Sequence, residues 1–131
     1  MIQKNINLLV VDDSSVIRNL ISRYAGSMNV NVVATAANGE DALAMYKLYR
    51  PNAVSMDLGM SGWGSEDQGG LECIRRIIEF DPEANILVVS AQTDKRQGLK
   101  AMSFGASGYL NKPIDADKLF AALNDLVYSD H

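Results

Sequence analysis

Several residue types on which active sites depend are scarce in this sequence of 131 residues. It has one cysteine, Cys73, so an internal disulfide and a zinc site built from cysteines are both excluded. Cys73 is instead expected to be a small buried side chain on a helix. The sequence also has one histidine, His131, which is its last residue. Because a chain terminus is a poor place for a general base or a metal ligand, mechanisms that need an internal histidine are excluded.

An excess of positive charge and long apolar segments are also lacking. Lys and Arg number 12 against 16 Asp and Glu, which gives a formal net charge of −4. A chain of this charge lacks the general attraction to phosphate backbones on which nucleic-acid binding depends, so no nucleic-acid partner is expected. No apolar run approaches the length of a membrane span, and the first residues do not resemble a signal peptide. We therefore expect a cytoplasmic protein without a membrane partner.

The sequence does have an alternation of short apolar runs and amphipathic segments. Strands are predicted over 6–11, 30–34, 52–57, 86–89 and 109–110, and a helical pattern follows each of them. This order predicts an α/β fold in which one parallel sheet of five strands is covered by helices on both faces. The sequence contains no linker or repeat, so a single domain is expected over 1–131, with its core over about 5–128.

Capping residues and apolar spacing predict the bounds and inner faces of the helices. Ser14 or Ser15 is expected to begin the first helix and Gly26 to end it, while Asp115 is expected to begin the last. The fourth helix is predicted from about Thr93 to Phe104. The apolar residues at inward spacing are Val16, Ile17, Leu20, Ile21 and Tyr24; Leu43, Tyr46 and, as a further candidate, Tyr49; Leu71, Ile74, Ile77 and Ile78; Leu99, Ala101 and Met102; and Leu119, Phe120, Leu123, Leu126 and Val127.

Charged and hydroxyl side chains stand where four of the predicted strands end: Asp12 and Asp13, Asp57, Ser90, and Lys112. Parallel strands bring their carboxyl ends to one edge of the sheet, where α/β proteins bind ligands. Two carboxylates 4 Å apart repel by about 4 kcal/mol at an effective dielectric constant of 20, so a raised pKa, the Lys112 ammonium or a divalent cation must offset the cluster. Oxygen ligands without histidine or thiolate suit Mg²⁺. We expect Asp12, Asp13 and Asp57 to bind Mg²⁺.

The same group of residues suits phosphoryl transfer, which asks a protein mainly for positioning and charge neutralisation. Asp57 is the candidate nucleophile that would form an acyl phosphate, with Lys112 and Ser90 contacting phosphoryl oxygens. Because the chain has no usable histidine, the phosphoryl donor must come from another molecule. Plainer alternatives stay open here. Asp12 and Asp13 also suit a helix N-terminus. Asp57 also fits a solvated loop acid, Ser90 an ordinary strand-end hydroxyl and Lys112 a surface lysine.

In their order along the chain, these residues resemble the receiver domain of bacterial two-component response regulators, in particular its stand-alone chemotaxis type. The resemblance covers nearly the whole chain. It rests on Asp12-Asp13, on Asp57, on Val89-Ser90-Ala91 and on the run from Phe104 to Pro113. It implies a doubly wound, flavodoxin-like sheet of order 2-1-3-4-5 with five helices.

The resemblance also implies a role for each matching position. Asp57 would be the phosphoacceptor, and the backbone carbonyl of Gly59 would join the three aspartates as a ligand of Mg²⁺. Ser90 would be a switch hydroxyl that moves toward the phosphoryl group, and Tyr109 an aromatic side chain that turns inward with it. Lys112 would contact the phosphate, and the peptide bond between Lys112 and Pro113 would be cis.

The segment after Asp57 departs from the pattern of the family. A βα loop usually takes two to six residues, whereas about twelve, 58–69, separate Asp57 from the next helical pattern. Trp63 in this loop is expected either to anchor it or to contact a partner. Glu66 and Asp67 are expected to face solvent, with contact to the metal as the alternative.

The predicted function is a phosphorylation-activated signalling switch rather than an enzyme. A sensor histidine kinase would phosphorylate Asp57, and the surface of the fourth helix, last strand and fifth helix would then bind a downstream protein, in chemotaxis or another two-component pathway. Two alternatives stay open: a phosphate-independent scaffold of the same fold, and a phosphohydrolase with an aspartyl-phosphate intermediate. The Asp-x-Asp motif of such enzymes is not matched, because Gly59 stands two residues after Asp57.

Overall fold

The computed structural model describes residues 5–91 and 95–128, so Thr93, the predicted start of the fourth helix, and His131 lie outside the described residues. Five strands form one parallel sheet in the order β2-β1-β3-β4-β5. The strands are β1 (Asn7–Val11), β2 (Asn31–Ala36), β3 (Ala53–Asp57), β4 (Ile86–Ser90) and β5 (Gly108–Asn111). The predicted α/β class and the sheet order implied by the resemblance are both confirmed.

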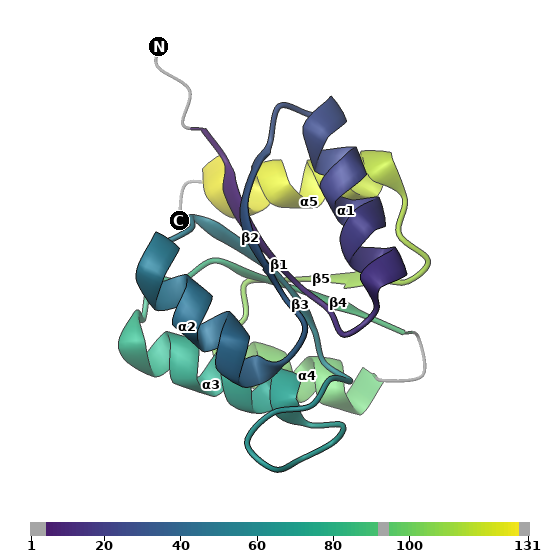
Figure 1. Ribbon diagram of the computed structural model, residues 1–131. Coiled ribbons are helices and arrows are strands. Elements are labelled where there is room, and N and C mark those ends of the chain that lie inside the picture. The colour runs from purple at the N-terminus through teal and green to yellow at the C-terminus, as the bar shows by residue number, and fades with distance from the viewer. Residues whose placement is uncertain (1–4, 92–94, 129–131) are drawn as a thin grey trace.

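Helices cover both faces of the sheet (Figure 1). The helices α1 (Ser15–Ser27) and α5 (Ala116–Tyr128) lie on one face, and α2 (Gly39–Tyr49), α3 (Gly69–Phe80) and α4 (Lys95–Ser103) lie on the other. The strands alternate between two cores. Leu8 and Val10 pack with α1 and α5, whereas Leu9 and Val11 pack with α2 and α3. The strands are therefore apolar on both faces, which is why they read as continuous apolar runs.

Side-chain caps fix where several helices begin. The Ser14 hydroxyl accepts a hydrogen bond from the Ile17 amide (3.3 Å), and the Asp115 carboxylate accepts one from the Asp117 amide (2.8 Å), as predicted. The prediction that Gly26 ends α1 is wrong. The helix continues to Ser27, and the left-handed residue that follows is Asn29, with φ of 60°. Asn tolerates this conformation better than most residues, so it serves here in place of glycine.

Some predicted inner faces are too wide. Val16 is 73% exposed and Leu99 is 74% exposed, and Met102, Phe120 and Tyr49 are exposed as well. The buried residues of α4 are Gly98 and Ala101, and those of α5 include Leu119 and Leu123. Leu99 and Phe120 each follow a buried residue by one position, which turns them about 100° away from the sheet. Apolar character alone did not distinguish side chains that face the sheet from side chains that face solvent.

The loop between β3 and α3 folds back onto the start of α2 (Figure 1). The Gly39 amide donates a hydrogen bond to the Ser61 carbonyl (2.9 Å), and the Gly69 amide donates one to the Met60 carbonyl (2.8 Å). Met60 is fully buried. Gly62, Gly39 and Gly69 approach one another closely, and a side chain on Gly69 would overlap the backbone of Ser61. Glycine at these positions is thus needed for the loop to dock.

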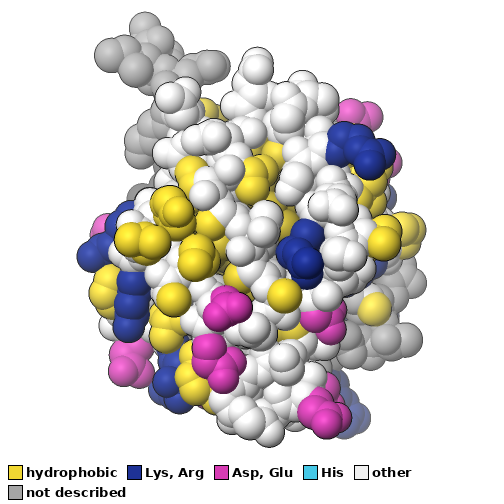
Figure 2. Space-filling model, viewed as in Figure 1, with side chains coloured by type: hydrophobic (Ala, Val, Ile, Leu, Met, Phe, Trp, Pro, Cys, Tyr) yellow, Lys and Arg dark blue, Asp and Glu magenta, His cyan; other side chains and the backbone are white. Residues whose placement is uncertain are grey.

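The surface carries charges of both signs. On the face shown in Figure 2, Lys and Arg side chains are interspersed with Asp and Glu side chains. Among the helices of the described residues, none combines the length and the apolar character that crossing a membrane requires.

Candidate functional site

Three carboxylates meet at the carboxyl edge of the sheet. One oxygen from each of Asp12, Asp13 and Asp57 lies within 4.8 Å of the others. The sheet register explains why: Val11 in β1 pairs with Met56 in β3, so the residues that follow them lie side by side. Asp12 is 1% exposed and Asp57 is 7% exposed, whereas Asp13 is exposed. The cluster is therefore a partly buried, negatively charged pocket.

Lys112, which directly follows β5, brings the opposite charge to this pocket. Its ammonium lies 3.1 Å from Asp12 Oδ2 and 3.5 Å from Asp57 Oδ1. The Lys112 amide donates to the Ser90 carbonyl (2.8 Å), which extends the pairing of β4 with β5 by one residue. The peptide bond between Lys112 and Pro113 is cis, as the resemblance implied. The structure thus brings Asp12, Asp13, Asp57 and Lys112 together.

Burial and neighbouring charges shift the protonation equilibria of the two facing groups. Burial, and then the negative charge of Asp12, raise the pKa of Asp57 from 3.8 to about 6, although Lys112 and the Gly59 amide oppose this shift. Burial lowers the pKa of Lys112, but Asp57 and Asp12 outweigh it and hold that pKa above its ordinary value. Lys112 therefore compensates the cluster only in part, because the pKa of Asp57 stays raised beside it.

Several carboxylate oxygens of the pocket accept few hydrogen bonds and are available to bind a hard divalent cation. Asp12 Oδ1 accepts a hydrogen bond from the Ser14 amide (2.9 Å). Asp12 Oδ2 is buried and accepts no hydrogen bond of good geometry from the described residues, and it has the Lys112 ammonium as its ion-pair partner. Asp57 Oδ1 has one long hydrogen bond, from the Gly59 amide (3.4 Å). Mg²⁺ prefers oxygen ligands such as carboxylates, and these oxygens have lone pairs that no hydrogen bond occupies.

The sequence matches the family described as response regulator receiver domain over residues 8–124. The chain belongs to this family. It is similar to chemotaxis protein CheY of Thermotoga maritima, with 30% identity over 117 residues, which cover 89% of this chain and 93% of that protein. It is also similar to CheY of Halobacterium salinarum, with 33% identity over 120 residues, which cover 92% and 95% of the two chains.

A solved relative agrees with this assignment. The structure of the CheX–CheY–BeF₃–Mg²⁺ complex from Borrelia burgdorferi matches with a TM-score of 0.81 and 28% identity, over 92% of this chain and 88% of that chain. The resemblance inferred from the residues is thereby confirmed: this is a CheY-like receiver domain of the two-component type, a family of signalling phosphoacceptors.

Of two further predicted residues of the receiver domain, Ser90 lies at the strand end beside the pocket, whereas Tyr109 packs against α4. Asp57 pairs with Val89, so Ser90 comes next to it at the end of β4; Ser90 is 1% exposed and its hydroxyl donates a long hydrogen bond to the Ala91 carbonyl (3.5 Å). The Tyr109 hydroxyl is buried and has no hydrogen-bond partner among the described residues. A side chain on Gly98 would overlap the Tyr109 ring, so that ring lies directly against the backbone of α4.

The loop residues lie apart from the acidic pocket. Glu66 and Asp67 are exposed and do not belong to the carboxylate cluster, so the alternative of contact with the metal is not supported. Trp63 is half-buried and packs against the core formed with α2 and α3, as an anchor of the loop would. Cys73 is buried on α3, as predicted.

Sequence reasoning missed two contacts at the pocket. Arg18 donates a hydrogen bond from Nη1 to the Asp12 carbonyl (2.7 Å). Gly70 lies so close to the backbone of Asp57 and Leu58 that a side chain would overlap both. The glycine pair at the start of α3 was the available signal for the second contact, whereas nothing in the sequence distinguished Arg18 from a surface arginine.

Proposed function

We propose that this receiver domain is a phosphorylation-activated signalling switch of a cytoplasmic two-component pathway, in which Asp57 accepts a phosphoryl group from a sensor histidine kinase. The observation that carries the proposal is the meeting of Asp12, Asp13, Asp57 and Lys112 in one pocket. The described relatives named CheY favour chemotaxis as the pathway. We further propose that residues 1–131 form a single domain with its core over about 5–128, and that 58–69 is an extended loop on it.

Asp57 is suited to act as the nucleophile. With a pKa near 6 its carboxylate is mostly ionised at neutral pH. One of its oxygens would attack the phosphorus of a phosphohistidine, the new O–P bond forming as the N–P bond breaks, and the electron pair left on the imidazole nitrogen would take up a proton from water. Lys112 lies 3.5 Å from Asp57 Oδ1, where its ammonium can pair with an incoming phosphoryl oxygen. The domain would act as the phosphoacceptor of the kinase rather than as a turnover enzyme.

Mg²⁺ is the proposed cofactor of this transfer. The residues that would hold it are Asp12, Asp13 and Asp57, with the Gly59 backbone carbonyl as a fourth protein ligand. When bound, the ion would supply neutralisation of the charge on the transferred group. The Mg²⁺ in the solved Borrelia relative supports this choice of metal. Asp12 is positioned for this role by Ser14 and Arg18, which hold its side chain and its carbonyl.

Ser90 and Tyr109 are the proposed switch residues. The Ser90 hydroxyl would donate a hydrogen bond to the phosphoryl group, and Tyr109, whose buried hydroxyl lacks a partner among the described residues, would adjust its position against α4. The face of α4, β5 and α5 would then bind a downstream protein. A groove of about 330 Å³ between α4 and β5, lined by Leu99, Met102 and the Tyr109 ring among others, supports this location. Exposed apolar residues of this kind commonly mark an interaction surface.

The test is phosphorylation by a small donor. Incubation with acetyl phosphate and Mg²⁺ should add the mass of one phosphoryl group to the wild-type protein, as measured by intact-protein mass spectrometry. Asp57→Asn should remove the modification, while Asp67→Asn, which changes an exposed aspartate of the neighbouring loop, should keep it. An unmodified wild type would instead favour the phosphate-independent scaffold, and turnover of a phosphoester would favour the phosphohydrolase.

A further inference from the structure

The loop between β3 and α3 forms one wall of a groove that the phosphoryl chemistry does not use. Its Trp63 ring lies so close to Gly39 that a side chain there would overlap it, while the Arg76 guanidinium stacks over the ring at 4.4 Å. A cation stacked on an aromatic face in this way is attracted by the ring. Trp63 is therefore held between α2 and α3.

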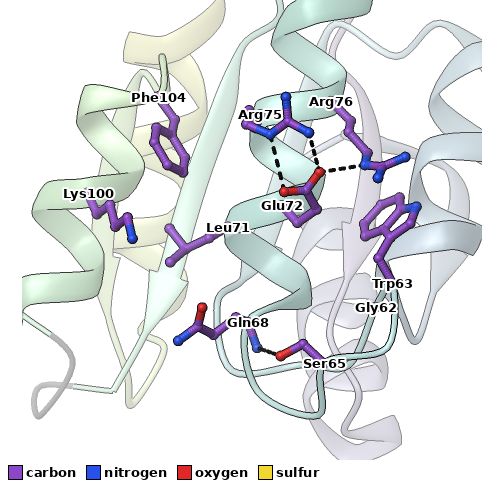
Figure 3. A pocket seen from close by; sticks show the side chains of 10 residues that line it. All are labelled: Gly62, Trp63, Ser65, Gln68, Leu71, Glu72, Arg75, Arg76, Lys100 and Phe104. Atoms are coloured by element: carbon purple, nitrogen blue, oxygen red, sulfur yellow. Dashed lines mark hydrogen bonds and ion pairs between the residues drawn. The ribbon is translucent and has the colours of Figure 1, made fainter.

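The groove lies between this loop, α3 and α4 and has a volume of about 410 Å³ (Figure 3). Leu71 points from α3 toward α4, and Phe104, which directly follows α4, lies across from it. Leu71 is only 4% exposed, so most of the apolar surface in the groove comes from the half-buried Phe104, with polar side chains around it. It is distinct from the apolar groove between α4 and β5, because Lys100 and Phe104 line the first and Lys95 and Leu99 line the second.

The charged residues that line this groove are mostly cationic: Arg75, Arg76 and Lys100 against one carboxylate, Glu72. Both arginines donate hydrogen bonds to Glu72, and these bonds hold its pKa at about 2 (Figure 3). Arg75 also forms an ion pair with Glu79 (3.2 Å), which does not line the groove. Lys100 forms no ion pair with any described carboxylate and lies 5.9 Å from the centre of the Phe104 ring. The described helix α4 contains no acidic residue. The lining residues thus carry three positive charges against one negative charge, in a chain whose net charge is −4, and Lys100 is the cation among them without a described carboxylate partner.

We propose that the groove between the Trp63 loop, α3 and α4 binds an acidic segment of a partner protein, with one apolar side chain of that segment seated against Leu71 and Phe104. Charge complementarity argues for this occupant: the local cations would attract carboxylates although the net negative charge of the whole chain repels them. A polyanion such as nucleic acid would meet that repulsion along its whole length. A second copy of this chain, also at −4, would meet it as well.

A labelled peptide tests the proposal directly. The probe is a fluorescein-labelled peptide of about a dozen residues, made of Glu, Asp, Ser and one central Leu, and binding is measured by fluorescence anisotropy. Trp63 is the single tryptophan of the chain and lines the groove, so its emission should change along the same binding curve. Affinity should fall as ionic strength rises from about 0.05 to 0.5 M, because exposed charges are then screened. Replacing the central Leu by Ser should weaken binding further.

Two matched variants locate the peptide. Lys100→Glu and Lys95→Glu make the same change of charge on the same helix, but Lys100 lines the proposed groove and Lys95 lines the groove beside β5. Lys100→Glu should weaken binding about tenfold and Lys95→Glu by less than about twofold. Both replace exposed lysines, and an unchanged urea midpoint would confirm that each variant is folded.

Several results would overturn the proposal. One is that the acidic peptide does not bind, or that a lysine-rich peptide of equal length binds as tightly. Another is that both lysine variants weaken binding equally, since the peptide would then follow overall charge. Tighter quenching of Trp63 by a nucleoside triphosphate than by the peptide would make the groove a small-anion site. Self-association of the wild type that Lys100→Glu abolishes would assign it to a second copy. None of these outcomes depends on whether Asp57 is phosphorylated.

Discussion

Replacing Asp57 by Asn should stabilise the protein when no metal is present. The carboxyl group of Asp57 has its pKa raised from 3.8 to about 6 in the folded state, first by burial and then by the charge of Asp12. A raised pKa means that the folded state binds the proton more tightly than the unfolded state does. The ionised carboxylate therefore costs stability. This cost is absent below the unfolded pKa, grows as pH rises, and is complete above the folded pKa.

The size of the effect follows from the shift. A shift from 3.8 to about 6 is roughly two pKa units, and at about 1.4 kcal/mol per unit the ionised group costs about 3 kcal/mol at pH 8. At pH 5, where the folded carboxyl group is mostly protonated, the cost is about half as large. Asn resembles the protonated acid in shape and charge, so Asp57→Asn should recover most of each amount.

Urea unfolding in EDTA at pH 8 and at pH 5 measures both amounts, with Asp125→Asn on the exposed face of α5 as the control for loss of one negative charge. The Asp57 variant should gain stability at both pH values and about 1 kcal/mol more at pH 8, while the control stays within about 0.5 kcal/mol of the wild type. Mg²⁺ should reverse the order, because it stabilises only the protein that binds it. An Asp57→Asn variant less stable than the wild type in EDTA at pH 8 would refute the electrostatic account.

Three further substitutions test neighbouring contacts. Lys112→Met should destabilise the metal-free protein by about 2 kcal/mol at pH 8 and by less at pH 5 in the same assay, because it leaves buried carboxylates without their cation. Gly70→Ala should lower the free energy of unfolding by more than about 2 kcal/mol, because the added methyl group would overlap the backbone of Asp57; a wild-type urea midpoint would contradict this. Gly98→Ala should displace the Tyr109 ring, which the Tyr109 resonances in NMR spectra would report; unchanged shifts would show that α4 moves instead.

The parts of the fold that the sequence predicted are those set by local pattern. β1 and β4 are continuous apolar runs, and each is bounded by residues that begin a helix or loop, so their positions were readable. Parallel topology then placed their carboxyl ends at one edge of the sheet without further information. The strand order did not follow from the pattern, since it depends on how helices pack in space; it came from the family resemblance.

The rest depended on contacts between distant segments. Leu99 and Ala101 are both apolar residues in one short helix, yet one is exposed and the other is buried, because the position of α4 against the sheet decides. The path of the Trp63 loop depends likewise on Gly39, which is distant in sequence and leaves room for the ring. A glycine at a helix start reads in the sequence as a capping or flexible position, and only the packed structure reveals what it makes room for.

The charge of the acidic pocket explains why a hydroxyl group beside it matters. Three carboxylates and one ammonium give the pocket a formal charge of −2 when all are ionised, so a bound divalent cation would make it formally neutral. Phosphorylation would replace the single negative charge of Asp57 by an acyl phosphate with up to two negative charges. The pocket with its bound cation would then be negatively charged again. The other cation beside the pocket, Arg18, already donates to the Asp12 carbonyl, so the extra charge has to be met by a hydrogen-bond donor. Ser90 lies at the adjacent strand end, next to the partner of Asp57 in the sheet. The need for that donor in one charge state and not in the other is what would make the site a switch.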